Sequence, residues 1–162
     1  MRQRGLAESG KFERMKKHLQ ISLVLASLWA AQAMAPLTPV GLWHTIDDQT
    51  GEPKGEVQIV EKDGVLTGKV VRSLRNDPKA RVNCDDCKDD RKGQAIIGME
   101  IIRGVKKETA DEALWAGGGK ILDPENGKEY TVRMTPKEDG KKLQVRGYIG
   151  PFFRTQVWVR AQ

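Results

Sequence analysis

The chain has 162 residues, with 28 Lys or Arg and 22 Asp or Glu, which gives a formal net charge of +6. Residues 1–35 hold six of the basic residues and two of the acidic ones, so the remainder is nearly neutral, with 22 basic and 20 acidic side chains. Both signs are interspersed there, which excludes the clustered basic face of a nucleic-acid-binding domain. Residues 36–162 have the length of a single domain.

Residues 1–35 are predicted to be an N-terminal extension and a cleaved signal peptide. A basic stretch follows Met15, the expected start of translation, and precedes the apolar run Leu19–Ala31. Two A-x-A patterns follow, ending at Ala33 and Ala35, an order typical of secretory signals. The run is shorter than the roughly 20 apolar residues of a transmembrane helix. We therefore expect a periplasmic or secreted protein, cleaved after Ala33 or Ala35, with no transmembrane segment.

From residue 36 onward, short strand-like segments alternate with turn signals. The Asp63-Gly64 and Asp139-Gly140 pairs are typical of tight hairpins, because Asp-Gly readily adopts positive φ. Regular short strands with hairpin-length connections predict an all-β fold, and closure would remove exposed edges. We therefore expect a single antiparallel, roughly eight-stranded up-and-down barrel over residues 36–162. Its strands are predicted at residues 41–47, 56–61, 65–72, 96–103, 113–122, 128–135, 143–149 and 154–160.

Two residues at the ends of this pattern resemble the calycin arrangement of lipocalins and streptavidin-like proteins. The first predicted strand opens with Gly41-Leu42-Trp43, and the last ends at Arg160. In those folds the arginine of the closing strand packs over the tryptophan of the opening strand and seals one end of the barrel. A guanidinium can stack on an indole and still bond free carbonyls. The alternative is that Trp43 and Arg160 are unrelated core and surface residues of a sandwich.

The segment after the leader also resembles the bacterial secreted family called domain of unknown function 2147. Five stretches carry the resemblance and together span nearly all of Leu42 to Arg160: GLWHTIDDQTG, EKDGVLTGKVV, CDDC, GGGKILDPENGKEY and RGYIGPFFRTQVWVR. The resemblance implies an exported, calycin-like β-barrel. It implies no activity, substrate or catalytic residue.

Cys84 and Cys87 form a C-x-x-C pair among aspartates, which leaves three interpretations open. In an oxidising compartment two nearby thiols are expected to form a disulfide, which would stiffen the long connection over residues 73–93. Redox activity is disfavoured because the flanking aspartates penalise the thiolate. A zinc site lacks ligands, since His44 is the only histidine after residue 36. We therefore expect a structural disulfide, no metal and no cofactor.

Catalytic groups are scarce: after residue 36 the only serine is Ser73 and the only histidine is His44. We assign no catalytic residue and favour a non-enzymatic role.

Polar side chains of the last two strands are the candidates for contact with a ligand. In one interpretation they face solvent, and four residues fill the core: Leu143, Val145, Val157 and Val159. In the other, a polar, aromatic-lined cup is formed by Trp43, Arg146, Tyr148, Gln156 and Trp158. An eight-stranded barrel can hold one small ligand, and such a cup would suit a small anionic or amphipathic molecule.

The sequence thus indicates an exported, periplasmic β-barrel protein of unknown activity, for which we favour the binding of a small ligand. Two alternatives remain. One is a structural or protein-interaction module of the cell envelope that uses an exposed face of the barrel. The other is a thiol- or metal-handling protein that uses Cys84 and Cys87.

The leader predicts that the exported chain begins after Ala33 or Ala35, because signal peptidase cleaves after a small residue that follows the apolar run. Intact mass of the protein isolated from the periplasm measures this directly. A periplasmic species that still begins at Met1 or Met15 would contradict the prediction.

Overall fold

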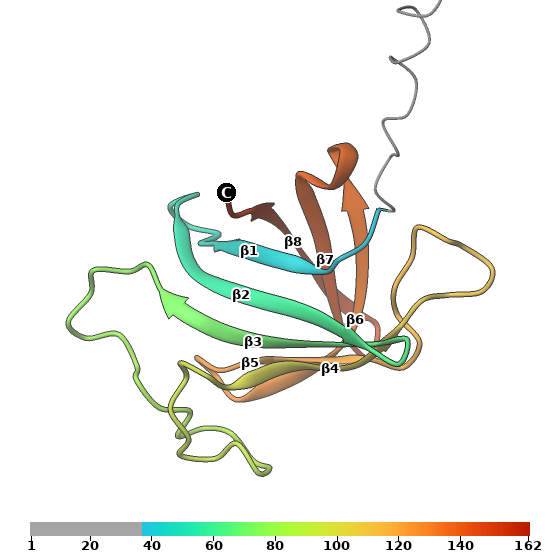
Figure 1. The fold of residues 1–162 in the computed structure, drawn as a ribbon. Helices are drawn as coiled ribbons and strands as arrows, with labels where there is room; N and C mark the ends of the chain where they lie inside the picture. Colours follow the sequence, from blue (N-terminus) through green and yellow to red (C-terminus); the bar gives the residue numbers. More distant parts are fainter. Residues whose placement is uncertain (1–36) are drawn as a thin grey trace, which may run out of the picture. The chain divides into compact units, whose positions relative to one another are not determined.

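The computed structural model describes residues 37–162, which form a closed barrel (Figure 1). Each strand pairs antiparallel with the next in sequence, and β8 pairs with β1, so the predicted all-β, eight-stranded up-and-down barrel is confirmed. The leader predicted at residues 1–35 lies outside the described residues. Within residues 37–162, no helix has the length and apolar character needed to cross a membrane. The strands are β1 (Gly41–Ile46), β2 (Pro53–Lys62), β3 (Val65–Ser73), β4 (Glu100–Lys106), β5 (Lys120–Asp123), β6 (Lys128–Lys137), β7 (Lys142–Ile149) and β8 (Phe152–Arg160), with the short 3-10 helix η2 (Glu138–Gly140) between β6 and β7.

Two strands begin later than the sequence indicated. The apolar pattern predicts that β4 begins at residue 96 and β5 at residue 113, but the two strands begin at Glu100 and Lys120. Gly98 has φ 89° in a turn just before β4, and Gly117 and Gly118 have φ 43° and 82° just before β5. These angles lie outside the β region, so glycine turns replace strand where the apolar pattern had suggested it.

The connections between strands gather at the two ends of the barrel, because successive strands of an up-and-down barrel run in opposite directions. One end carries the Asp63-Gly64 turn, residues 107–119 and η2, and we call it the closed end. The other carries residues 47–52, 74–99, 124–127 and 150–151, and we call it the open end. The 74–99 loop is the long green connection that leaves β3 in Figure 1.

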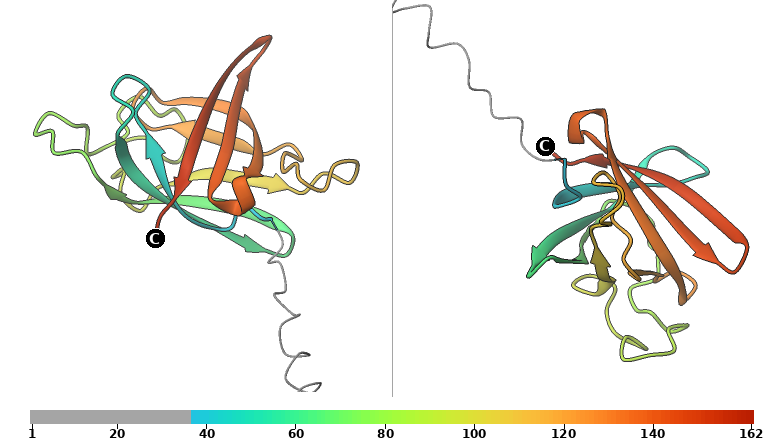
Figure 2. Two further views of the ribbon diagram at one scale, coloured as in Figure 1. Left: turned by 90° about the horizontal axis from the view of Figure 1, so that it is seen from above. Right: turned by 90° about the vertical axis from the view of Figure 1, so that its right-hand side faces the viewer.

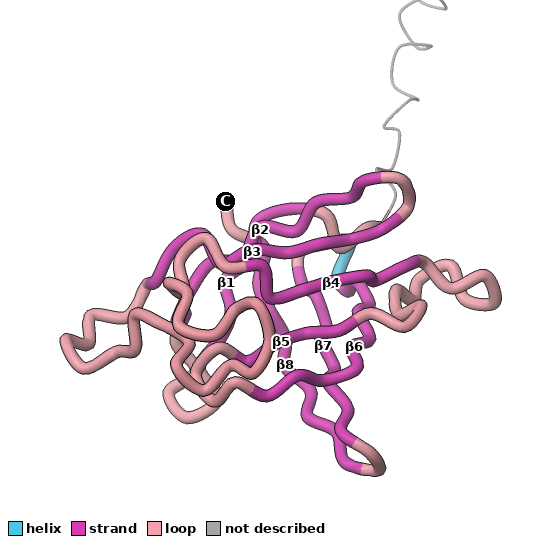
Figure 3. Tube along the Cα trace, turned by 90° about the horizontal axis from the view of Figure 1, so that it is seen from below, coloured by secondary structure: helices cyan, strands magenta, loops and turns pink. Residues whose placement is uncertain are grey.

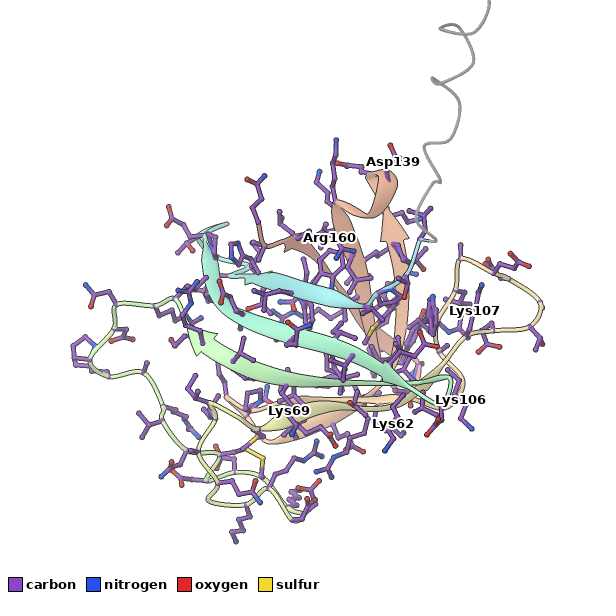
Figure 4. All side chains as sticks on the ribbon, in the orientation of Figure 1. Lys62, Lys69, Lys106, Lys107, Asp139 and Arg160 are labelled. Atoms are coloured by element: carbon purple, nitrogen blue, oxygen red, sulfur yellow. A yellow bond between two sulfur atoms is a disulfide. The ribbon has the colours of Figure 1, made fainter. Side chains whose placement is uncertain are left out.

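Trp43 and Arg160 seal the closed end. Trp43 is fully buried, and the Arg160 guanidinium carbon lies 4.2 Å from the centroid of the Trp43 ring. Figure 4 labels Arg160 near the end of the chain. Arg160 Nε donates to the carbonyl of Gly140 at 2.6 Å, and its Nη1 donates to the carbonyl of Val40 at 3.1 Å. Trp43 Nε1 donates to the carbonyl of Pro39 at 2.7 Å. The pair therefore ties together the segment before β1, η2 and the end of β8.

The Gly41-x-Trp43 spacing has a steric reason. Gly41 has φ 142°, and a Cβ atom built there would lie 2.2 Å from Arg160 Nη1. The stacked guanidinium occupies the space that a side chain at position 41 would need. The glycine and the arginine are thus parts of one arrangement, which the sandwich alternative does not require.

The hydrophobic core fills the half of the barrel next to this seal. Inward-facing side chains alternate with outward-facing ones along each strand. Seven aliphatic and methionine side chains have no exposed surface and lie outside the lining of the cavity that remains at the open end. They are Ile59, Leu66, Ile102, Val105, Val132, Met134 and Leu143.

Replacing either residue of the seal should destabilise the barrel. Trp43→Ala should lower the free energy of unfolding by about 3–5 kcal/mol, as for other large aromatic core residues. Arg160→Lys should lower it by roughly 1–3 kcal/mol, because an ammonium neither stacks as a plane nor reaches both carbonyls. Urea unfolding measures both. Arg81→Lys, at an exposed arginine whose one salt bridge within residues 37–162 is with Asp86, is the matched control, with an expected change within about 0.5 kcal/mol. An equally small effect of Arg160→Lys would show that the stack does not hold the end closed.

Candidate functional site

The open half of the barrel encloses a cavity of about 670 Å³. Its wall is built from inward-facing side chains of strands all around the barrel. Most of the surface that lines the cavity is apolar, so water in the cavity finds few partners there. The apolar wall includes Val57, Val70, Ile101, Leu122, Val145 and Trp158.

Polar side chains at the mouth bond mainly to one another. Gln156 Nε2 donates to Asp48 Oδ1 at 3.0 Å, and Gln156 Oε1 accepts from Trp158 Nε1 at 3.3 Å. Arg154, one inward-facing position nearer the mouth, also pairs with Asp48. These contacts fix the ring of Trp158 against the cavity and leave a polar rim above an apolar interior.

Arg75 bridges two loops across the mouth. Its guanidinium donates to Asp47 Oδ2 at 2.5 Å and to Glu125 Oε1 at 2.7 Å, which joins the β1–β2 loop to the β5–β6 turn. The hydrogen bond from Arg75, together with backbone N–H donors of Gln49 and Thr50, lowers the pKa of Asp47 to about 2. Asp47 is therefore ionised at neutral pH. Sequence reasoning missed this bridge, because its residues lie in three segments far apart in the chain.

The 74–99 loop contributes one side of the cavity. Its lining residues include Val82, Ile96 and Ile97. Val82 is 74% exposed and Ile97 is 50% exposed, so the loop presents apolar side chains to solvent beside an apolar cavity. A ligand in the mouth would cover them.

The 74–99 loop is also cross-linked by a disulfide and packed against the β5–β6 turn. The structure joins Cys84 and Cys87 in a disulfide, seen as the yellow bond in Figure 4, and both residues are buried. The loop packs so closely on the β5–β6 turn that a Cβ at Gly127 would lie 2.1 Å from the carbonyl oxygen of Asp86. Within residues 37–162, no group of three or more His, Cys, Asp or Glu side chains is placed to hold a metal ion.

Arg91 anchors the loop to the barrel. Its side chain is buried and donates to Asp89, to Glu129 Oε2 at 2.7 Å and to the carbonyl of Glu100 at 3.2 Å. The bond from Arg91 lowers the pKa of Asp89 to about 2. Arg103 adds a second link from β4, donating to both carboxylate oxygens of Asp90 at 2.8 and 2.9 Å. The loop that lines the cavity is thus held by a disulfide and two arginine–carboxylate clusters.

The predicted ligand-lining residues separate into three places. Gln156 and Trp158 line the cavity. Trp43 lies beneath Arg160 at the closed end instead, and its inclusion in the cup is corrected.

Arg146 and Tyr148 are a further correction, because they lie on the outer face of the barrel. Val145 stands opposite Gln156, and Arg146 stands opposite Thr155. Cross-strand partners share a face, so Val145 and Gln156 both point inward. Alternation correctly grouped the residues within each strand, but it could not tell which group of β7 shares a face with which group of β8. For the same reason Val157 and Val159, the predicted core residues of β8, are exposed.

Comparison with known proteins supports the fold and the family. Residues 41–160 match the family model described as "Uncharacterized protein conserved in bacteria (DUF2147)", and the chain belongs to this family. A search of curated proteins found no match. A solved protein from the human pathogen Helicobacter pylori, described as belonging to the lipocalin family, is similar in fold. Its TM-score is 0.64 at 18% sequence identity, over 78% of this chain and 84% of that one. This likeness shows a lipocalin-like barrel.

The arginine anchor should make the protein lose stability as the pH falls from about 4 to about 2. Arg91 lowers the pKa of Asp89 from 3.8 to about 2, so the folded state holds this proton less tightly than the unfolded state. The resulting stabilisation is present above the unfolded value and is lost as the pH falls through the folded one. Asp89→Asn should therefore lose less stability than the wild type over this window, as measured by urea unfolding at stepped pH. Asp85→Asn, at an exposed aspartate with no ion pair within residues 37–162, is the matched control. Identical pH profiles for Asp89→Asn and the wild type would rule out this anchor.

Proposed function

We propose that the protein is an exported binder of one small amphipathic molecule, held in the open half of the barrel. The observation that carries the proposal is the cavity of about 670 Å³ with an apolar wall and a polar rim. Sites for small molecules measure about 300–1,000 Å³ and combine apolar walls with a few placed polar groups. The lipocalin-like barrel supports the same conclusion, because eight-stranded barrels of this kind can enclose one small ligand.

The charges at the mouth favour an amphipathic ligand over a small anion. The rim arginines Arg75 and Arg154 already pair with carboxylates, so a ligand's head group would exchange one ion pair for another. Exposed pairs of this kind contribute about 0–1 kcal/mol. An apolar chain of about ten carbons contributes on the order of 8 kcal/mol before the costs of association. The apolar body should therefore supply most of the affinity, with the rim orienting the head group.

Export is part of the proposal. The Cys84–Cys87 disulfide supports it, since disulfides persist mainly in oxidising compartments such as the periplasm. Both cysteines are buried in this bond, which favours a structural role for the pair over the handling of thiols or metals. The disulfide, the arginine anchors and the Arg75 bridge all hold the loops around the mouth, as a preformed ligand site requires.

The cavity should bind phenylnaphthylamine, a neutral apolar fluorophore, with quenching of Trp158, which lines the wall. Decanoate and decanol should both displace the probe, because they share the apolar chain and differ only in charge. Val70→Phe and Val145→Phe each add bulk inside the cavity and should weaken probe binding by about tenfold or more, equivalent to about 1.4 kcal/mol.

Val60→Phe, at an exposed outer position of β2, is the matched control and should bind like the wild type. Native mass spectrometry of the protein isolated from the periplasm should then identify the retained molecule. Unchanged probe affinity in both filled-cavity variants, or no displacement by either competitor, would contradict binding in the barrel.

A further inference from the structure

The β7–β8 hairpin ends in a projecting tip with exposed aromatic side chains. The two strands extend beyond the neighbouring elements (Figures 2 and 3), and β8 pairs with β1 only through Val159 and Arg160. At the tip, Phe152 is 77% exposed, Phe153 is 60% exposed and Ile149 is 45% exposed. Scattered apolar residues on a surface are ordinary, but a contiguous exposed group marks an interaction site.

Two arginines behind the tip face each other without acidic partners. Arg133 of β6 stands directly opposite Arg146 of β7 on the outer face. Like charges in this position repel, and no carboxylate within residues 37–162 forms a salt bridge with either guanidinium. An anion between them would relieve the repulsion.

Aromatic rings hold these two guanidinium groups in place. The Arg133 guanidinium carbon lies 5.3 Å from the centroid of the Tyr148 ring, and that of Arg146 lies 4.8 Å from the centroid of the Phe153 ring. The two rings lie 5.8 Å apart. Arg133, Arg146 and Tyr148 also line a hollow of about 140 Å³ on the outer face. The aromatic rings, the two guanidinium groups and the hollow therefore form one continuous surface with the tip.

We propose that the β7–β8 hairpin docks the barrel onto an anionic phospholipid surface. Ile149, Phe152 and Phe153 enter the boundary between head groups and acyl chains, where aromatic side chains are favoured. Arg133 and Arg146 hold a lipid phosphate from the hollow behind the tip, because a planar guanidinium bonds phosphate oxygens through two N–H groups.

A membrane fits this surface better than a protein partner does. A specific protein interface buries about 800 Å² on each partner, whereas the apolar part of the tip comprises only a few side chains around one turn. The tip is also convex and projecting, a shape that a fluid lipid interface can accommodate around it. The unpaired arginines add an attraction that an anionic surface supplies at many positions at once.

Docking in this way would turn the mouth of the barrel toward the lipid. Gly147 and Arg154 are cross-strand partners that line the cavity, and the next pair, Tyr148 and Phe153, begins the tip. A membrane at the tip therefore lies beside the cavity entrance. The docking itself stands independently of whether the cavity holds a ligand.

Sedimentation with vesicles tests the apolar part of the proposal, using vesicles of phosphatidylethanolamine and phosphatidylglycerol. The Phe152→Ser/Phe153→Ser double variant should lose about tenfold or more in vesicle affinity for each phenylalanine removed. The matched control is Val60→Ser/Val71→Ser, which removes two exposed apolar side chains elsewhere on the barrel, and it should bind like the wild type. Thermal unfolding checks that every variant is folded.

Vesicles of phosphatidylcholine, which carry no net charge, test the part played by the arginines. Arg133→Gln/Arg146→Gln should weaken binding to the anionic vesicles by about fivefold per arginine and should change binding to phosphatidylcholine little. Lys62→Gln/Lys106→Gln is the matched control, because it removes two charges from the closed end, where Figure 4 labels both lysines. If Arg133→Gln/Arg146→Gln and Lys62→Gln/Lys106→Gln lost equal affinity for the anionic vesicles, the assignment of the phosphate site would be overturned.

A tryptophan at the tip reports insertion independently of any other membrane-binding segment. Fluorescence of Phe152→Trp should be quenched by brominated acyl chains, whereas that of Val60→Trp should change no more than that of the wild type. The proposal is overturned if the wild type stays in the supernatant with anionic vesicles, as a protein-binding tip would. It is equally overturned if the double phenylalanine variant binds like the wild type, or if Phe152→Trp is not quenched.

Discussion

The stack of Arg160 on Trp43 decides which half of the barrel is solid and which half is hollow. A closed sheet has two ends, and each end exposes carbonyls and apolar edges to water unless something covers it. Arg160 covers one end with a single side chain, by bonding the carbonyls of Gly140 and Val40 while its plane lies on the Trp43 ring. The fully buried core collects behind this cover. The other end carries the 74–99 loop and three shorter connections.

Different interactions stabilise the open end of the barrel. Apolar side chains such as Val70, Ile101 and Leu122 are buried there too, but they surround a cavity. Further order comes from covalent and ionic links: the Cys84–Cys87 disulfide, the buried Arg91 with its acidic partners, and Arg75 across the mouth. Such links fix loops without filling the space between them. The barrel thus has one sealed end and one end with a cavity.

Apart from Arg160 in the seal, the arginines within residues 37–162 fall into two classes that the sequence does not distinguish. Most are paired with carboxylates and hold strands and loops together, as Arg91 and Arg103 do. Arg133 and Arg146 instead stand opposite each other on the outer face, stacked on aromatic rings. Folding alone gains nothing from placing two like charges side by side. This arginine pair stands beside exposed phenylalanines, and the combination distinguishes the hairpin tip from the rest of the barrel. The proposed contact with an anionic phospholipid surface would explain it.

The sequence by itself determined the barrel, its strand order and its seal, because these depend on local signals. Alternation, Asp-Gly turns and the Gly41-x-Trp43 and Arg160 positions are all readable along the chain, and so is the short spacing that brings Cys84 to Cys87. Where glycines at positive φ interrupt an apolar run, as at Gly98 and Gly117, the same signals misplaced the strand ends. Only the tertiary structure decided which residues line the cavity. Alternation divides each strand into two faces, but the register between β7 and β8 decides which faces meet. This register places Val145 and Gln156 inside the barrel and leaves Arg146 and Tyr148 on its outer face. The Arg75 bridge was equally unreadable, since Asp47, Arg75 and Glu125 become neighbours only when the sheet closes and brings three separate loops to one end.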